Sequence, residues 1–142
     1  DTGLLSDISP LANLPLLQTL HLDSNAILDV SPLAGLSSLK TLTLSANGLV
    51  DVSSLATLSN LEGLSLAFNG VRNLRPLGQL RSLKRLSLEG NPQLRNLAPL
   101  QSLAQLEELT LARNTRISDY TPLRGISYIR CLNIKYTGFD DS

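Results

Sequence analysis

Two side chains able to act as a nucleophile or general base occur once each in the chain, His21 and Cys131. In the repeat pattern described below they fall in strands five repeats apart, which at a strand spacing of about 4.8 Å separates them by roughly 24 Å. A catalytic pair must lie within hydrogen-bond reach, so these two residues do not form one. The sequence also has no glycine-rich phosphate loop and no cluster of metal-binding residues at ligand spacing. We therefore expect neither an enzyme nor a cofactor-binding protein.

Carboxylates and amides recur at one place in the repeat and are the candidates for a metal site. That place is occupied by Asp7, Asp29, Asp51, Asn73, Asn96 and Asp119. Asp and Asn side chains can fold back onto nearby backbone N–H groups. Two residues later the chain often has a Ser or Thr, which is a good helix cap. The Pro that often comes next fixes φ at the first position of a helical turn. Stacked carboxylates could instead bind calcium. Because Asn replaces Asp midway, we predict capping and no metal site, with calcium as the alternative.

These motifs belong to a repeat that is marked by asparagine. Steps of 22, 22, 22 and 23 residues separate Asn25, Asn47, Asn69, Asn91 and Asn114. Alternating apolar residues such as Leu42 and Leu44 predict a short strand with one buried face. Apolar residues at every third position from 53 to 61 predict a 3-10 or short helical return. One repeat cannot bury its own leucines, whereas stacked repeats can, so the pattern predicts a solenoid with a parallel sheet.

The asparagine position and the last repeat carry further expectations. Each buried amide is expected to bond the backbone of its own and of the adjacent repeat, which would form a ladder. Gly3 and Thr137 take the asparagine position at the two ends, where the ladder stops. Tyr120 and Phe139 take apolar positions in the last repeat. We expect both aromatic side chains to fill its core.

The pattern L-x-x-L-x-x-L-x-L-x-x-N-x-I-x-D-V-S-P-L resembles the leucine-rich repeat family. Within that family it is similar to the 22-residue class found in bacterial internalins and in a repeat-type regulator of protein phosphatase 1. The resemblance runs from Leu4 to Phe139. It implies an α/β fold, a right-handed leucine-rich-repeat solenoid forming a horseshoe segment, with a parallel sheet on the concave side and short 3-10 or helical returns on the convex side.

The same resemblance implies a class of function. Both groups of relatives suggest a module that binds a protein partner on the concave sheet face. The resemblance to internalins implies a secreted or cell-surface bacterial adhesion module, and the resemblance to the phosphatase regulator implies an intracellular regulatory scaffold. The Asp-x-Ser-Pro-Leu motif favours the internalin resemblance. We therefore expect an internalin-like protein-binding repeat, with a secreted or cell-surface bacterial location.

Length and composition fit one domain. The chain has 142 residues, 42% of them hydrophobic, and no apolar run long enough to span a membrane. A single cysteine allows no intrachain disulfide. Residues 1–142 are predicted to form a single leucine-rich-repeat domain of about six coils. Because neither end carries a polar covering element, we expect incomplete end caps, and a chain that is part of a longer protein or whose ends are covered by a partner.

Charge is uneven along the chain. Residues 1–62 carry six acidic groups and one lysine, a net −5, and residues 63–130 carry a net +6. In successive repeats the same strand position is occupied by Gln18, Lys40, Glu62, Lys84, Glu107 and Arg130. The charge at this position alternates in sign from Lys40 onward, which predicts a ladder of ion pairs between neighbouring strands. Arg85 is expected to pair with Glu108 beside it. The basic middle makes nucleic acid a rival partner, but the pairing disfavours it; its contacts would be Arg72, Arg75, Arg95 and Arg116.

The strand residues that alternate with buried leucines should form the open face of the sheet. The middle of this face is small and polar, a trough able to admit a helix or loop, and its rim carries residue types enriched in binding hot spots. The predicted partner-binding residues are Phe68, Arg113, Tyr136, Arg85, Glu89, Lys135, His21 and Asp23. One alternative is that Phe68 and Tyr136 only cover a bend of the chain. Another is that the whole chain is a structural spacer within a larger protein.

Overall fold

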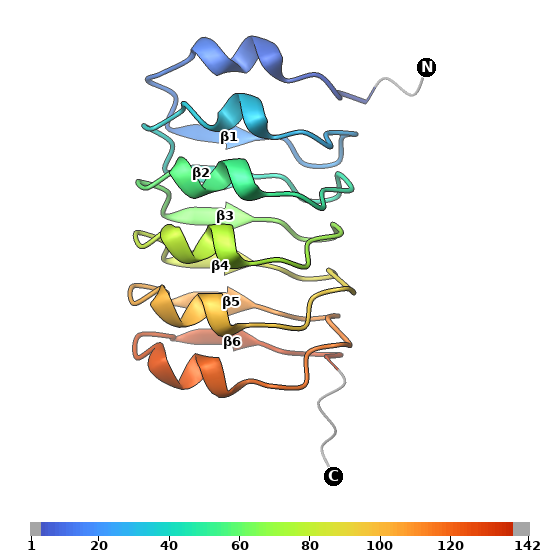
Figure 1. Cartoon of the computed structure of the whole chain (residues 1–142), viewed down its shortest axis with the longest axis vertical. Helices are drawn as coiled ribbons and strands as arrows, with labels where there is room; N and C mark the ends of the chain where they lie inside the picture. The colour runs from blue at the N-terminus through green and yellow to red at the C-terminus, as the bar shows by residue number, and fades with distance from the viewer. Residues whose placement is uncertain (1–3, 138–142) are drawn as a thin grey trace.

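The computed structural model describes residues 4–137, so the expectations for Gly3 and Phe139 lie outside the described residues. The chain forms a stack of coils in which strands make one layer and 3-10 turns make the other (Figure 1). Six strands form one parallel sheet in the order of the sequence, as the repeat predicts. The elements are η1 (Ser9–Asn13), β1 (Thr19–His21), η2 (Ser31–Leu33), β2 (Thr41–Thr43), η3 (Ser53–Thr57), β3 (Gly63–Ser65), η4 (Arg75–Gln79), β4 (Arg85–Ser87), η5 (Ala98–Ser102), β5 (Glu108–Thr110), η6 (Thr121–Gly125) and β6 (Cys131–Asn133).

The register of the sheet keeps equivalent residues of successive coils side by side. Thr41 pairs with Thr19 on one side and with Gly63 on the other, and Arg85 pairs with Glu108. Alternation along each strand sends leucines inward and the residues between them outward. In β2, Leu42 is fully buried while Thr41 is half-buried on the open side. The side chains on this open side form what we call the sheet face.

The interior is a continuous column of leucines between the sheet and the 3-10 turns. Leu44, Leu49, Leu55 and Leu58 belong to a single coil and are all completely buried. Each fully buried leucine side chain stabilises the fold by about 1.5–3 kcal/mol relative to an exposed one. Tyr120 packs against this column in the last coil, which confirms the expectation for it.

The asparagine ladder forms as predicted. Asn69 is 7% exposed, and its Oδ1 accepts hydrogen bonds from the N–H groups of Gly48 and Leu49 at 2.8 and 2.9 Å. Its Nδ2 donates to the carbonyls of Leu44 and Leu66 at 2.9 and 3.1 Å. One amide therefore satisfies backbone groups of two coils, which a bend with this register leaves unpaired. At the last coil Thr137 takes this place, buried, and its hydroxyl donates only to its own coil, at Ile134.

Six aspartates and asparagines hold the start of each 3-10 turn. In every coil the Oδ1 of this residue accepts the N–H two residues later, for example from Ser31 to Asp29 at 2.8 Å; the residues are Asp7, Asp29, Asp51, Asn73, Asn96 and Asp119. The backbone hydrogen bond from Ser31 lowers the pKa of Asp29 below its usual value, with the Ser31 hydroxyl adding to this. Capping by this position is confirmed.

The expectation that Ser or Thr caps the turns is wrong. The 3-10 turns begin at these residues, as at Ser31, so each one lies inside the turn and makes no capping bond. The reason is that the Asp or Asn side chain already takes the exposed N–H. In the described part of the chain no group of three or more His, Cys, Asp or Glu side chains is placed to hold a metal ion. The carboxylates at the turn starts point to their own backbone, which favours capping over the calcium alternative.

Burial of the leucine column depends on having a coil on each side. Leu14, in the first described coil, is 43% exposed, and Leu132, in the last strand, is 45% exposed. Their counterparts within the stack are buried: Leu36, equivalent to Leu14, is 0% exposed, and Leu86, equivalent to Leu132, is 3% exposed. Each coil therefore completes its neighbour's core, as expected of a solenoid.

Candidate functional site

The floor of the sheet face is shallow and hydroxylated. A hollow of about 220 Å³ lies across β2 to β5, lined by Thr41, Thr43, Gly63, Leu64, Ser65, Arg85, Leu86, Ser87, Glu108 and Thr110. Short side chains leave the floor flat. The Thr and Ser positions in the middle of the face are small and polar, as predicted, and the hollow is too open to enclose a small substrate.

At one edge of this floor the backbone enters the left-handed region in every coil. The positions are Ser24, Ala46, Phe68, Gly90, Arg113 and Tyr136, with φ between 55° and 67°; we call them the bend column. Their N–H groups continue the strand ladder, as when Phe68 donates to the carbonyl of Glu89 at 2.7 Å. The ladder thus holds the bend in place. A residue other than glycine costs about 1–2 kcal/mol in this conformation.

Phe68 packs in the bend column over a glycine. Its side chain is 52% exposed, and its ring lies so close to Gly90 that a methyl group there would come within 2.6 Å of Phe68 Cδ1. Gly90 therefore serves two purposes, since it adopts a positive φ and leaves room for the ring. The ring therefore packs over Gly90 while about half of the side chain stays open to solvent.

Arg113 and Tyr136 occupy the next two places in the column and contact each other. The Arg113 guanidinium carbon lies 5.5 Å from the centre of the Tyr136 ring, within cation–π range. Arg113 Nε also lies 3.3 Å from Glu89 Oε1. Tyr136 is 74% exposed. Phe68, Glu89, Arg113 and Tyr136, together with Gly90 beneath the ring, form a ridge beside the floor that we call the rim.

A second cluster lies at the far end of the sheet face, on β1 and β2. The His21 ring nitrogen Nδ1 lies 3.0 Å from Thr43 Oγ1, and this hydroxyl donates to Asp23 Oδ2 at 2.5 Å. The N–H of Ser45 donates to Asp23 Oδ1 at 2.7 Å. Partial burial raises the pKa of Asp23, but the hydrogen bonds from Thr43 and Ser45 outweigh it and lower the pKa below its usual value.

This cluster is not arranged for nucleophilic catalysis. A general base must take the proton of the nucleophile, whereas here the Thr43 proton is directed to Asp23 rather than to His21. Asp23 is also a weak base, because its pKa is lowered rather than raised toward neutrality. Cys131 is exposed on β6, at the opposite end of the sheet from His21.

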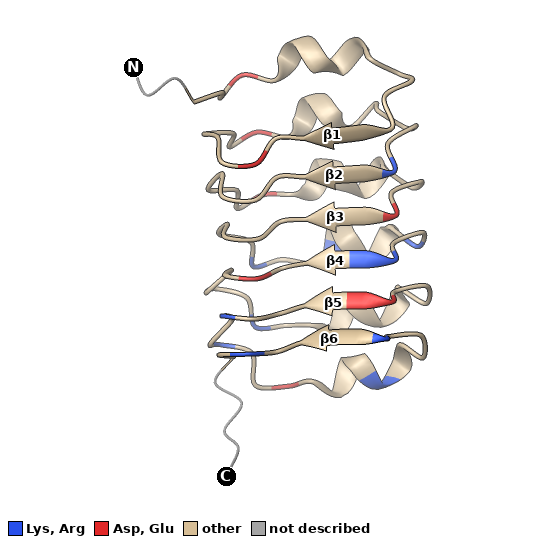
Figure 2. Ribbon diagram, turned by 180° about the vertical axis from the view of Figure 1, so that it is seen from behind, with Lys and Arg blue, Asp and Glu red and all other residues tan. Residues whose placement is uncertain are grey.

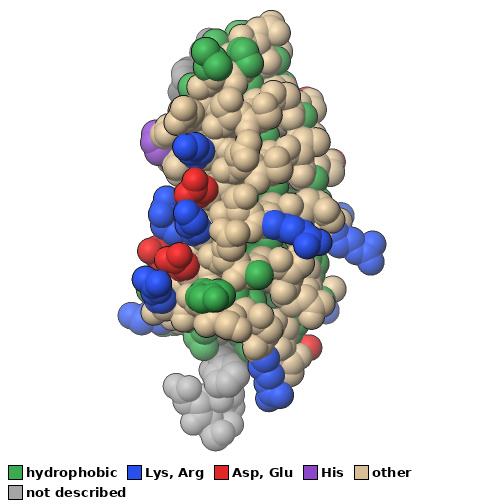
Figure 3. Space-filling view, turned by 90° about the vertical axis from the view of Figure 1, so that its left-hand side faces the viewer, with side chains coloured by type: hydrophobic (Ala, Val, Ile, Leu, Met, Phe, Trp, Pro, Cys, Tyr) green, Lys and Arg blue, Asp and Glu red, His purple; other side chains and the backbone are tan. Residues whose placement is uncertain are grey.

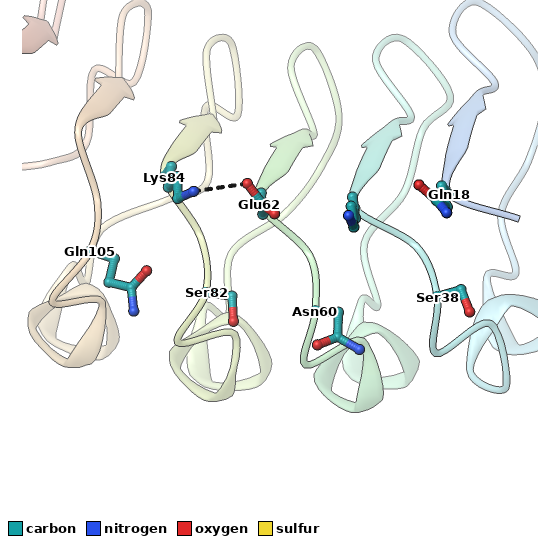
Figure 4. A pocket seen from close by; sticks show the side chains of 8 residues that line it. Gln18, Ser38, Asn60, Glu62, Ser82, Lys84 and Gln105 are labelled. Atoms are coloured by element: carbon teal, nitrogen blue, oxygen red, sulfur yellow. Dashed lines mark hydrogen bonds and ion pairs between the residues drawn. The ribbon is translucent and has the colours of Figure 1, made fainter. Parts of the chain in front are cut away.

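The opposite edge of the floor carries the alternating charges predicted from the sequence. Figure 3 shows basic and acidic side chains alternating along this edge of the molecule. A polar groove of about 440 Å³ runs beside them, lined by Gln18, Ser38, Lys40, Asn60, Glu62, Ser82, Lys84 and Gln105 (Figure 4). Lys84 Nζ lies 2.9 Å from Glu62 Oε2, and this hydrogen-bonded lysine lowers the pKa of Glu62.

The rest of the predicted ion ladder does not form. Among the described residues only two ion pairs lie within 4 Å, Lys84 with Glu62 and Arg113 with Glu89. Arg85 does not pair with Glu108. It lies instead over β3, where a methyl group on Gly63 would be 3.4 Å from its Nη2. Exposed ion pairs are worth only about 0–1 kcal/mol, so small packing differences decide which of them form.

The eight predicted contact residues therefore share one face but fall into two clusters. Phe68, Glu89, Arg113 and Tyr136 belong to the rim, with the exposed Lys135 next to it, and His21 and Asp23 belong to the cluster on β1 and β2; Arg85 lies on the floor between them. Sequence reasoning missed Thr43, which links His21 to Asp23, and Gly90, which seats Phe68. A glycine in a column otherwise filled by side chains was the available signal for Gly90.

The comparison with known families gives the same repeat. A family model that describes two copies of a leucine-rich repeat matches residues 15–57, 59–102 and 81–125. The chain belongs to the leucine-rich repeat family. No curated protein sequence matches this leucine-rich repeat chain. Members of the family generally serve as protein-interaction modules rather than enzymes.

Solved structures place the chain beside bacterial relatives. It is similar to the internalin InlF of Listeria monocytogenes, with a TM-score of 0.88 and 34% identity over 92% of this chain and 38% of that one. For internalin C2 of the same species the TM-score is 0.82 and the identity 36%, over 92% of this chain and 57% of that one. For mouse RP105 in its complex with MD-1 the values are 0.69 and 27%, over 84% and 22%. The chain thus spans well under two thirds of these proteins.

The predicted fold class and the internalin-like family are thus confirmed. No helix in residues 4–137 is long and apolar enough to cross a bilayer.

Proposed function

We propose that this leucine-rich repeat chain recognises a protein partner through the concave sheet face, with the rim as the main contact. The observation that carries the proposal is the conformation of Phe68. A half-exposed aromatic side chain stands at a positive φ, and the glycine beside it is the one residue that leaves room for its ring. The positive φ is shared by the whole bend column, so it is the exposed aromatic ring seated on Gly90 that makes Phe68 a candidate contact.

Two further properties of the rim support a binding role. Aromatic and arginine side chains dominate binding energy in protein interfaces. Here the Arg113 side chain is already held between Tyr136 and Glu89, so less side-chain freedom is lost when it binds. The flat floor beside the rim offers hydroxyl groups that a helix or loop of the partner would contact.

The similarity to two Listeria internalins supports a bacterial surface or secreted adhesion module, and we propose that type over an intracellular regulatory scaffold. We also propose that residues 1–142 form one domain whose end coils are covered in the working protein. The exposed core leucines of those coils, such as Leu14 and Leu132, support this.

The proposal is tested by affinity capture with three forms of the chain, using extracts of animal cells and of bacteria. The rim form carries Phe68→Ala, Arg113→Glu and Tyr136→Ala. A matched control form carries Arg72→Glu and Arg95→Glu, two exposed arginines outside the sheet face. All three forms are first shown to unfold at similar urea concentrations.

A protein captured by the wild type and the control form, but not by the rim form, is the expected result. Loss in the control form alone would move the site to the arginine-bearing surface, and a capture that falls steeply with salt would point to nucleic acid. Equal capture by all three forms would refute the rim as the site. No capture by any form would favour a structural spacer.

A further inference from the structure

The cluster on β1 and β2 has a defined direction of hydrogen bonding. Asp23 has a lowered pKa, so its carboxylate is ionised at neutral pH and can only accept hydrogen bonds. Thr43 must therefore give its single hydroxyl proton to Asp23, at 2.5 Å. The Thr43 oxygen keeps its acceptor capacity, so the contact of 3.0 Å with His21 requires a proton on His21 Nδ1.

This direction determines what the cluster offers to the outside. A neutral histidine with its proton on Nδ1 has an acceptor at Nε2, and His21 is exposed on the sheet face. Asp23 Oδ1 and Oδ2 each accept one hydrogen bond from the protein and have capacity for more. With His21 in its neutral form, every free polar position of the cluster is thus an acceptor.

No lysine or arginine of residues 4–137 occupies this acceptor cluster. Among the described residues, His21 is the one side chain whose charge, when it is protonated, acts on the Asp23 carboxylate, and neither of the two ion pairs in that part of the chain involves Asp23. Lys40, just before β2, acts instead on Glu62. The first 62 residues also carry a net charge of −5, which attracts a cation to this end.

We propose that His21, Thr43 and Asp23 form a subsite for a cationic side chain, a guanidinium or an ammonium group, of the protein partner. This inference rests on the proposed function and deepens it. The rim at the other end carries Arg113, with Lys135 next to it, and Figure 2 shows acidic colouring after β1 and basic colouring after β5 and β6. The partner then lies along the stack in one direction, with its basic end over β1 and β2.

The histidine tautomer can be measured directly, because the chain contains one histidine. Long-range ¹H–¹⁵N NMR at about pH 8, where histidine is neutral, distinguishes the two tautomers without assignment. We expect the Nδ1–H form in the wild type. In Thr43→Val, which keeps a β-branched residue in the strand, we expect the Nε2–H form to become the main one because Nδ1–H has lost its acceptor.

The subsite itself is tested with N-acetylarginine amide as the probe and the neutral N-acetylglutamine amide as its match. We expect the arginine probe to shift the His21 Nε2 resonance saturably and to bind about threefold or more tightly than the neutral probe, as an exposed charged contact allows. Asp23→Asn should remove this preference. Circular dichroism is used to check that Thr43→Val and Asp23→Asn are folded. If one variant is unfolded, the measurement on the other decides.

A main Nε2–H form in the wild type, or equal shifts with both probes, would overturn the proposal. So would an arginine preference that Asp23→Asn leaves unchanged. These measurements use the free chain and small probes, whereas the proposed function is tested by capture of a protein on the rim. Failure of one therefore leaves the other result standing.

Discussion

Removing one rung of the asparagine ladder should cost a large share of the stability of the fold. Asn69→Ala deletes an amide whose oxygen accepts three N–H groups and whose nitrogen faces three carbonyls, at distances from 2.8 to 3.2 Å; the groups belong to Asn47, Gly48, Leu49, Leu44, Leu66 and Ala67. An Nδ2 group has two protons, so up to five backbone groups lose a partner. Each buried unpaired group costs about 1–3 kcal/mol.

Partial entry of water into the bend reduces this cost, so we expect Asn69→Ala to lower the free energy of unfolding by about 3–5 kcal/mol. Asn25→Ala is the matched control. Its oxygen accepts one N–H, from Leu5, and the side chain is half-buried near the end of the stack, so its removal should cost about 1 kcal/mol.

The assay is equilibrium unfolding in urea at neutral pH, followed by circular dichroism and by a second probe to test for a single transition. A short solenoid can lose coils from its ends, so the two probes must agree before the free energies are compared. Equal losses of unfolding free energy in Asn69→Ala and Asn25→Ala would refute this prediction. They would show that an interior asparagine pairs no more buried backbone groups than the asparagine at the end of the stack.

Three further predictions concern the bend column and the turn starts. Gly90→Ala should lower the free energy of unfolding by about 1–2 kcal/mol, because its φ is +67° and the methyl group would meet Phe68 at 2.6 Å. Gly35→Ala, with no atom within 4 Å of the new methyl group, is its neutral control in the same urea assay. Asp29→Ala should lower the urea midpoint, whereas Asp29→Asn keeps the oxygen that accepts from Ser31 and should change the midpoint little at pH 7; equal losses would contradict the capping role. The turn-start carboxylates have lowered pKa values in the folded state, so their contribution is complete above the ordinary value of 3.8 and is lost as pH falls below it; they are Asp7, Asp29, Asp51 and Asp119. Urea midpoints between pH 5 and pH 2 should show this loss, and replacing all four by Asn should flatten that part of the curve.

Much of the fold follows from the sequence because the repeat constrains it many times over. The alternation at Leu42 and Leu44 and the step between Asn47 and Asn69 each recur in register, so strand, bend and return are specified by several copies at once. Burial then has one solution, since no coil covers its own leucines. The asparagine ladder was predictable for a related reason, because a buried amide has to use its donors and acceptors.

The details that failed are those that the repeat does not constrain. Long, exposed side chains choose partners for a few tenths of a kcal/mol, so the register of Arg85 and Glu108 did not make them a pair. The start of the 3-10 turns depended on a competition between two good capping residues, Asp29 and Ser31, which the sequence alone left undecided.

The candidate site was predictable as a face but not as two clusters. Strand alternation placed His21 on the open side of the sheet, and the column just beyond the strands placed Phe68 and Arg113 at its rim. Backbone conformation and side-chain direction then decided their surroundings, such as the positive φ of Phe68 and the contact of His21 with Thr43. Neither property is fixed by a repeat whose outward positions vary from coil to coil.

Site-specific photocrosslinking tests the central claim, recognition of a protein by the sheet face, most directly. p-Benzoylphenylalanine replaces Phe68 in one form, where it keeps an aromatic ring at the rim, and replaces the exposed Gln101 of η5 in another, on the side of the turns. Both forms are irradiated in the same cell extracts. The account predicts a discrete protein adduct at position 68 and none at position 101. An adduct at position 101 alone, the same adduct at both positions, or none at either would contradict it.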